Sequence, residues 1–476
     1  MHLPRVVVAP PDKRGLRSVR LGDQVVGAAW SARELREILV REGFPADMDL
    51  DDRALICWRE AGSDTWPDRK RARLATAAVM AAGLVMSGAV LIIVGSEDAF
   101  GALTFASRVT GFLFFLAGLL QLAAALAVRD YWGKRNIRYS GLLVLMGVLI
   151  ALQVHTMLLT LWFEEREFTP WAFTYMPLSV WAVWATWIVI RERAWQGIPH
   201  PRKVAAGVLA TALLAAANFA YSAAYQPYAA HVQVTLSAEF GKPELDPREP
   251  VIHVPVTFSL QNTGKVPVNV IGSVFWVKGR TSEFTDGARE LAGATADVEE
   301  TADSELYAGL PTRRLLATGL IVDPGDWFDP GTGQVESVVV QVPKGADYES
   351  LEVDGDITVL RKDRGRVDDA FVHPLYSWWE GETDMVECPR ECGNYVFYMG
   401  ELTHNNNIIN VTRKQRYVVA IRLLGEDSDM YAAVSPLNDH GKVSGLNLDP
   451  DDRYGVETIL TGTVVIPFAT VLKTAA

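Results

Sequence analysis

The sequence predicts an α-helical membrane bundle that joins a small α+β domain to an all-β domain on the opposite side of the membrane. Three observations predict this organisation: five apolar runs of membrane-spanning length, an uneven distribution of Lys and Arg among their connections, and a second half built of short alternating segments. The expected domains are a cytoplasmic α+β domain at 1–67, a five-helix transmembrane domain at 68–225, a β-sandwich at 226–363, and a second β-rich region at 364–476. The sequence leaves open whether that last region is separate from the sandwich or continuous with it.

Five apolar runs define the membrane domain. Each contains about twenty residues, the length that an α-helix needs to cross about 30 Å of hydrocarbon. None contains an Asp, Glu, Lys or Arg, and a soluble protein with five such runs would have no polar face toward water. The predicted spans are 74–95, 109–128, 140–163, 170–190 and 204–225.

The short connections between the runs predict the orientation of the helices, because cytoplasmic loops are enriched in Lys and Arg. Twelve of these residues flank one side, whereas the other side has only Arg108 and Arg166. We therefore expect a cytoplasmic amino terminus, and an odd number of spans puts the chain after Tyr225 outside. The first run is too long for the apolar core of a cleavable signal peptide, so we expect a multi-pass protein of the cell membrane. The twelve residues are Arg69, Lys70, Arg71, Arg73, Arg129, Lys134, Arg135, Arg138, Arg191, Arg193, Arg202 and Lys203.

Polar side chains inside the spans are few. Pumps and coupled transporters keep ionisable groups in the bilayer, so the absence of Asp, Glu, Lys and Arg from these spans argues against such a function. An oligomeric channel or transporter component stays open as an alternative, with Gln153, His155 and Thr160 as its polar lining. His155 is the only intramembrane histidine and does not define a haem or metal site alone, so no cofactor is predicted. Small residues four apart, such as Gly83 and Ser87, favour close helix packing.

The first 67 residues have the pattern of a compact α+β domain. Segments 5–9, 18–26 and 53–58 read as strands. Ser31 and Glu34 match a capping box, in which the serine caps the helix and the glutamate reaches back to its start. The sequence therefore predicts a helix whose apolar side is formed by Leu35, Ile38 and Leu39.

The chain after residue 226 consists of short apolar or alternating segments separated by turn residues. Asn262-Thr-Gly264 lies between two such segments, and Pro-Gly pairs occur at 324–325 and 330–331. Over residues 230–361 this pattern resembles bacterial immunoglobulin-like sandwiches, and the resemblance implies two packed antiparallel sheets. The predicted strands are 231–239, 252–260, 266–277, 315–322, 335–342 and 356–361, followed by 394–399, 417–424, 429–434 and 458–472.

Two cysteines lie close together in the part expected outside the cell. Disulfides persist there, and we predict that Cys388 and Cys392 form one that closes a short loop. The alternative is a zinc site with His404 as a third ligand, but a structural zinc site needs four ligands and no fourth lies nearby. Residues 447–452 resemble part of a Ca²⁺ loop without the required glycine. No metal site is predicted.

Charge is distributed unevenly along the chain. From residue 226 on there are 21 basic and 38 acidic residues, a net charge of −17, which leaves +5 for the first 225 residues because the whole chain carries −12. So acidic a domain is unsuited to nucleic acid, which requires a basic surface. The expected partners are membrane lipid and another membrane or extracytoplasmic protein, or a second copy of this chain.

Familiar catalytic motifs are missing from the sequence, including G-x-G-x-x-G, Walker A, H-E-x-x-H and G-x-S-x-G. We therefore expect a non-enzymatic membrane protein whose acidic β-sandwich contacts a protein or the envelope, coupled to a cytoplasmic sensing or docking head. A second alternative is an envelope protein that binds or acts on carbohydrate. Its candidate surface patch is Trp378, Trp379, Glu380 and His404, because exposed aromatic rings beside acidic groups suit sugars.

Overall fold

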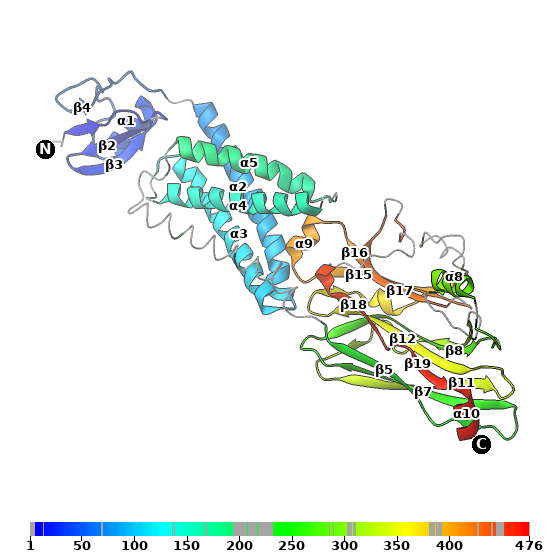
Figure 1. Ribbon diagram of the computed structural model, residues 1–476. Coiled ribbons are helices and arrows are strands. Elements are labelled where there is room, and N and C mark those ends of the chain that lie inside the picture. The colour runs from blue at the N-terminus through cyan, green and yellow to red at the C-terminus, as the bar shows by residue number, and fades with distance from the viewer. Residues whose placement is uncertain are drawn as a thin grey trace. The chain divides into compact units, whose positions relative to one another are not determined.

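The computed structural model describes most of residues 5–475 (Figure 1). The chain divides into two compact units: residues 1–220 with 406–413, and residues 221–405 with 414–476. We call them the helical unit and the β unit. The structure does not describe residues 1–4, 13, 68–69, 136, 138, 166, 168, 193, 195–206, 208–216, 218–231, 285, 289, 302–306, 308–310, 380–385, 387–392, 426–427, 439–440, 444–451 and 476.

The helical unit begins with a small head, residues 5–67, in which one helix packs on a four-stranded sheet. The sheet order is β3-β2-β1-β4, with β1 antiparallel to β2 and parallel to β4. Leu35 and Ile38 of the helix are buried against Val6 and Val19 of the sheet. The elements are β1 (Val6–Val8), β2 (Arg17–Leu21), β3 (Gln24–Ala29), α1 (Ala32–Arg41) and β4 (Ile56–Trp58).

Helix α1 begins where the capping box predicts. The Ser31 hydroxyl accepts a hydrogen bond from the Glu34 N–H at 3.3 Å, and the Glu34 carboxylate accepts one from the Trp30 N–H at 3.3 Å. The single strand predicted at 18–26 is wrong, because the chain reverses there to form the β2–β3 hairpin. Gly22 makes the turn with φ +60°, a conformation that glycine adopts without a Cβ clash.

Among the described residues of the helical unit, four helices are long and apolar enough to cross a membrane. They are α2 (Lys70–Gly101), α3 (Phe105–Tyr131), α4 (Ser140–Glu165) and α5 (Ala172–Arg191). The first is longer than the predicted run 74–95 and continues to Gly101. The fifth predicted run, 204–225, lies almost wholly outside the described residues.

Helices α2 and α3 approach each other closely through glycines spaced seven apart. A Cβ on Gly88 would lie 3.0 Å from the Gly118 carbonyl oxygen, and one on Gly95 would lie 2.8 Å from the Gly111 carbonyl oxygen. A seven-residue spacing returns to the same side of a helix after two turns. The contact is therefore a continuous seam that only glycine permits.

The described residues of the β unit form three sheets. A six-stranded sheet has the order β10-β8-β12-β18, with β9 also paired to β8 and β19 to β12. A four-stranded sheet has the order β11-β7-β5, with β6 also paired to β7, and a five-stranded sheet has the order β13-β15-β16-β17, with β14 also paired to β15. The two largest clusters of buried side chains in this unit lie on either side of the β8–β12 sheet.

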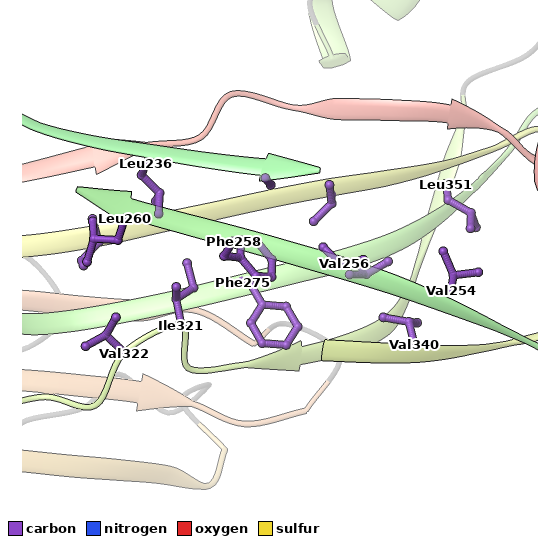
Figure 2. Packing of buried hydrophobic residues seen from close by; sticks show 14 of the residues in the cluster. Leu236, Val254, Val256, Phe258, Leu260, Phe275, Ile321, Val322, Val340 and Leu351 are labelled. Carbon is purple, nitrogen blue, oxygen red and sulfur yellow. The ribbon is translucent and has the colours of Figure 1, made fainter. Parts of the chain in front are cut away.

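The cores explain why β8 and β12 are almost continuously buried. Phe258 of β7 and Phe275 of β8 meet at 5.1 Å between ring centroids inside the sandwich formed with the four-stranded sheet (Figure 2). On the opposite face, Ile271 and Leu360 pack against Tyr398 of the five-stranded sheet. A sheet covered on both faces loses the alternation of buried and exposed residues.

The last strands of the chain return to the first sandwich. Strands β18 and β19 pair with β12, and Phe468 of the terminal helix lies in the sandwich core. The region 364–476 is therefore divided, since β13 to β17 form their own sheet and the later strands complete the earlier one. The strands and helices of the β unit, in chain order, are β5 (Val234–Phe240), β6 (Glu244–Leu245), β7 (Val251–Asn262), β8 (Val268–Thr281), α8 (Leu291–Thr301), β9 (Thr312–Gly319), β10 (Trp327–Phe328), β11 (Gly333–Pro343), β12 (Ser350–Arg361), β13 (Gly365–Val367), β14 (Leu375–Tyr376), β15 (Tyr395–His404), β16 (Arg416–Leu423), β17 (Met430–Pro436), β18 (Val456–Leu460), β19 (Val464–Pro467) and α10 (Phe468–Ala475).

Candidate functional site

One short helix from the later part of the chain belongs to the helical unit. Helix α9 (Asn407–Thr412) lies in sequence between β15 and β16, yet residues 406–413 cluster with the long helices (Figure 1). Asn406 caps it by accepting a hydrogen bond from the Ile408 N–H at 3.1 Å. The run of apolar residues that follows is buried rather than exposed.

The α9 contact, as we call it, forms where α2 ends. The Asn407 N–H donates to the Asp98 carboxylate at 2.8 Å, and its side-chain amide donates to the Val94 carbonyl oxygen at 3.3 Å. Thr169, which precedes α5, donates through its hydroxyl to the Val411 carbonyl oxygen at 3.3 Å. These bonds attach α9 to α2 and to the residue that leads into α5.

Apolar packing surrounds the polar bonds of the α9 contact. Ile408 and Val411 are 1% and 4% exposed and share a cluster with Val94, Leu158 and Tyr175. Asp98 itself is only 4% exposed. A buried carboxylate is stable only where hydrogen bonds satisfy it. The backbone N–H at the start of α9 donates a hydrogen bond that water would otherwise donate.

The head contact forms at the opposite end of α2. Arg14 donates to the Tyr131 carbonyl oxygen at 2.9 Å, forms an ion pair with Glu192, and lies 4.3 Å from the centroid of the Tyr131 ring. Beside it, Arg73 at the start of α2 donates to the Trp132 carbonyl oxygen at 2.8 Å and so joins α2 to the end of α3. Guanidinium groups suit such sites because they stack on aromatic rings while their N–H groups bind in the guanidinium plane.

Burial shapes the charges of the head contact. It lowers the pKa of the Arg14 guanidinium and raises the pKa of the Glu192 carboxyl, while each charge favours ionisation of the other. Arg73 also stacks on Trp30 of the head, with 3.8 Å from its guanidinium carbon to the ring centroid. The head therefore contacts the ends of α2, α3 and α5.

Buried polar groups also occur midway along α2. The Ser87 hydroxyl and His155 Nε2 are 2.8 Å apart, and both residues are fully buried. Ser179 of α5 donates to the Tyr175 carbonyl oxygen at 2.7 Å and to that of His155 at 3.3 Å. Among the described residues, His155 Nδ1 has no hydrogen-bond partner.

The residues predicted to line a channel do not share a face of α4. His155 is buried inside the bundle, whereas Gln153 and Thr160 are on its exposed side. Within the described part of the chain, no cluster of His, Cys, Asp and Glu has the arrangement of a metal site.

The aromatic part of the predicted surface patch is present. Trp378 and Trp379 are 51% and 50% exposed, and their rings lie 5.0 and 4.4 Å from that of Tyr376. His404 does not join them: β14, which carries Tyr376, pairs with Val396, eight residues before His404 along β15. His404 is 9% exposed and packs on Tyr454.

Three residues of the predicted sites lie outside the described part of the chain. They are Glu380 of the surface patch and the cysteines Cys388 and Cys392. The disulfide therefore stays a prediction, and the one described cysteine, Cys57, is a free thiol.

Sequence reasoning missed both contacts of α2. Asp98 looked like a loop residue because it follows the apolar run, and α9 lies among strands. A signal for α9 was present: Asn406 is a helix-capping residue, and Ile408 and Val411 are three residues apart, on one side of a helix. Arg14 carried no comparable signal.

Comparison with known proteins adds no family. The chain matches no protein-family model and no curated protein. Among solved structures it matches the "X-ray structure of Northeast Structural Genomics Consortium target SoR45", at 11% sequence identity over 28% of this chain and 74% of that one. The TM-score of that match is 0.16, which is too low to indicate a shared fold or function.

Proposed function

We propose that this chain is a non-enzymatic integral membrane protein that presents an acidic β domain outside the cell and couples it to a cytoplasmic head. The β domain contacts a protein or an envelope component, and the head senses or docks a partner in the cytoplasm. One observation carries the coupling: α2 is contacted at one end by the head, where Arg73 stacks on Trp30, and is bound at the other end by α9.

The same observation supports the five-span arrangement. Arg14 of the head binds Glu192, just after α5, so the chain leaves α5 at the head end of the bundle. Residues 406–413 lie at the other end. An odd number of crossings between these points favours the fifth span, 204–225, and the Lys and Arg distribution favours a cytoplasmic head. The immunoglobulin-like character of the sandwich is part of this proposal.

Coupling can be tested by disturbing one end of α2 and observing the other. Ile408→Asp puts a charge into the apolar part of the α9 contact. We expect faster amide hydrogen exchange not only around α9 but also in residues 12–16 of the head, measured by mass spectrometry on the full chain in lipid nanodiscs. Val411→Ala, a milder change, should give a smaller effect in the same places.

The matched control is Val335→Asp, which puts the same charge on β11 at a side chain that is already 64% exposed. It should leave exchange in residues 12–16 unchanged. If Ile408→Asp and Val335→Asp have the same effect on the head, the two ends are not coupled and the proposal fails.

A second candidate function, carbohydrate binding, rests on the exposed pair Trp378 and Trp379. Flat aromatic faces stack on sugar rings, and the Tyr376 ring contacts both indoles. Trp379→Ala should abolish retention on immobilised envelope polysaccharide, while Trp327→Ala, at an indole 57% exposed on β10, should not. Equal retention of both variants would dismiss this surface.

A further inference from the structure

A cleft lies between the head and the connection from α3 to α4. Its volume is about 510 Å³, within the usual range for small-ligand sites. One wall is formed by the start of the head and by β2 and β3, and the other by two cationic residues after α3. The lining residues are Pro10, Asp12, Leu16, Ser18, Val25, Val26, Gly27, Ala28, Lys134 and Arg135.

The two cations of the cleft differ in how they are held. Lys134 is exposed, and no carboxylate among the described residues forms an ion pair with it. Arg135 is fixed: its Nε donates to the Tyr131 carbonyl oxygen at 3.3 Å, its guanidinium carbon lies 4.9 Å from the Tyr131 ring centroid, and its Nη1 lies 3.3 Å from Asp12. The cleft therefore combines one adaptable and one oriented positive charge.

The backbone of Arg135 turns the chain where α3 ends, and its N–H donates to the Asp130 carbonyl oxygen at 3.0 Å. Its φ is +52°, in the left-handed region that residues with a Cβ seldom adopt. Such a conformation commonly ends a helix, and for a residue other than glycine it costs about 1–3 kcal/mol. Here it accompanies a guanidinium that lines the cleft just after α3 has ended.

We propose that this cleft binds an anionic group of the phosphate class. A planar guanidinium and a nearby ammonium are the usual pair of donors for such a group. With the orientation proposed above, the cleft lies on the cytoplasmic side beside the ends of apolar helices. The phosphate could therefore come from a phospholipid headgroup or from a soluble phosphorylated molecule, and the experiment separates these sources.

Binding at the cleft has a direct connection to the head contact. The incoming anion competes with Asp12 for Arg135. Asp12 also accepts hydrogen bonds from the N–H groups of Arg14 and Leu16, at 2.9 and 3.0 Å, and so shapes the loop that inserts Arg14 beside Tyr131. An anion in the cleft would thus act on the loop through which the head holds the helices.

Two variants with opposite expected effects test the site. Lys134→Glu reverses a cleft charge and should weaken binding about tenfold or more. Asp12→Asn removes the competing charge but keeps an oxygen that can accept the two loop hydrogen bonds, so it should tighten binding severalfold. Arg36→Glu is the matched charge reversal on the exposed side of α1 and should leave affinity unchanged.

The probes are pyrophosphate, measured by calorimetry on the full chain in non-ionic detergent, and phosphatidylglycerol, measured as retained adducts by native mass spectrometry from nanodiscs. A soluble ligand is supported if affinity for pyrophosphate is highest in Asp12→Asn, intermediate in wild type and lowest in Lys134→Glu. The same order seen only for the lipid supports a headgroup. Binding of neither probe, or equal binding by the two cleft variants, overturns the proposal.

Discussion

The two ends of the helical bundle are held by different chemistry. At the α9 end, apolar side chains, backbone hydrogen bonds and glycine contacts fill the space, and the one carboxylate is almost inaccessible to water. At the head end, three guanidinium groups stack on aromatic rings and also form ion pairs or hydrogen bonds to backbone carbonyl oxygens. They belong to Arg14, Arg73 and Arg135. Some of these groups reach solvent, such as Arg135 with a side chain 36% exposed.

This difference predicts how each end responds to change. A closely packed contact without exposed charges is insensitive to the solvent. The α9 end should therefore be altered only by substitutions that need more space or that remove a hydrogen-bond partner. Partly exposed charges respond to salt, to competing ions and to pH. The head end is therefore the adjustable end of the bundle, and α9 is the fixed one.

The largest effect is expected from Gly111→Val, which breaks the seam near the α9 end. A Cβ there would lie 2.3 Å from the Ala99 nitrogen and 2.6 Å from the Asp98 Cβ, so the helices must separate. We expect a loss of about 3 kcal/mol or more in stability, measured as a lower Tm and loss of monodisperse protein in detergent. Gly101→Val is the control, because a Cβ at Gly101 meets nothing within 4 Å. A normal Tm for Gly111→Val would show that the seam is not closely packed.

The next largest effect tests the head end through Arg14→Ala. This change leaves Glu192 without its cation and removes the donor to the Tyr131 carbonyl oxygen. Because both side chains retain some exposure, we expect a cost of about 2 kcal/mol rather than that of a fully buried pair. Hydrogen exchange of residues 5–30 should report it as loosening of the head.

Salt separates the head end from the α9 end in the same experiment. In about 1 M salt, amide hydrogen exchange in the wild-type head should become faster and approach the rate seen in Arg14→Ala. Exchange around α9 should not change. Arg14→Lys keeps the charge but not the planar stacking, and should fall between wild type and Arg14→Ala. If high salt loosens α9 as much as the head, the assigned difference between the two ends is wrong.

The β unit contains a partly buried carboxylate, Asp356, whose effect on stability can be measured as a function of pH. Burial, with a smaller contribution from the nearby charge of Asp429, raises the pKa of Asp356 from 3.8 to about 7. The folded state thus holds the proton more tightly than the unfolded state, so this group's stabilising contribution is present at about pH 4 and is lost as pH rises toward 7. We expect the Tm to fall over this window in wild type.

Asp356→Asn isolates the contribution of that group. It keeps the size and polarity of the side chain without its charge, so the variant should be more stable than wild type at pH 8, by about 1–2 kcal/mol once solvent screening is allowed for. The two proteins should converge near pH 4. An unchanged difference between pH 4 and pH 8 would mean that Asp356 does not titrate in this range.

Much of this architecture follows from local pattern. Four of the five apolar runs correspond to helices that are long and apolar enough to cross a membrane, because length and hydropathy alone decide whether a segment suits the bilayer. Ser31 and Glu34 predicted the start of α1 because a capping box is complete within four residues. Alternation of apolar residues predicted the strands, but not which sheet each would join, since β18 and β19 return about 100 residues later to β12.

The α9 contact could not have been predicted from sequence in the same way. Asp98 and Asn407, which form a hydrogen bond, are 309 residues apart in the sequence. The local sequence around neither residue indicates the other as its partner. The hairpin turn at Gly22 was missed for a smaller reason, because its two-residue turn interrupts an otherwise continuous alternation. Local rules thus predict the elements, whereas the pairing of distant surfaces depends on shape.

The smallest effect is expected from Asp98→Asn, and its comparison with Asp98→Ala tests what the α9 end requires. Asp98→Asn keeps an oxygen that can accept the Asn407 N–H, while Asp98→Ala leaves that buried N–H unpaired, at a cost of about 1–3 kcal/mol. If packing and satisfied hydrogen bonds hold this end, exchange around α9 should be close to wild type in Asp98→Asn and clearly faster in Asp98→Ala. If Asp98→Asn instead behaves like Asp98→Ala, the negative charge itself is needed. The α9 end would then depend on electrostatics as the head end does, and the contrast between the two ends would disappear.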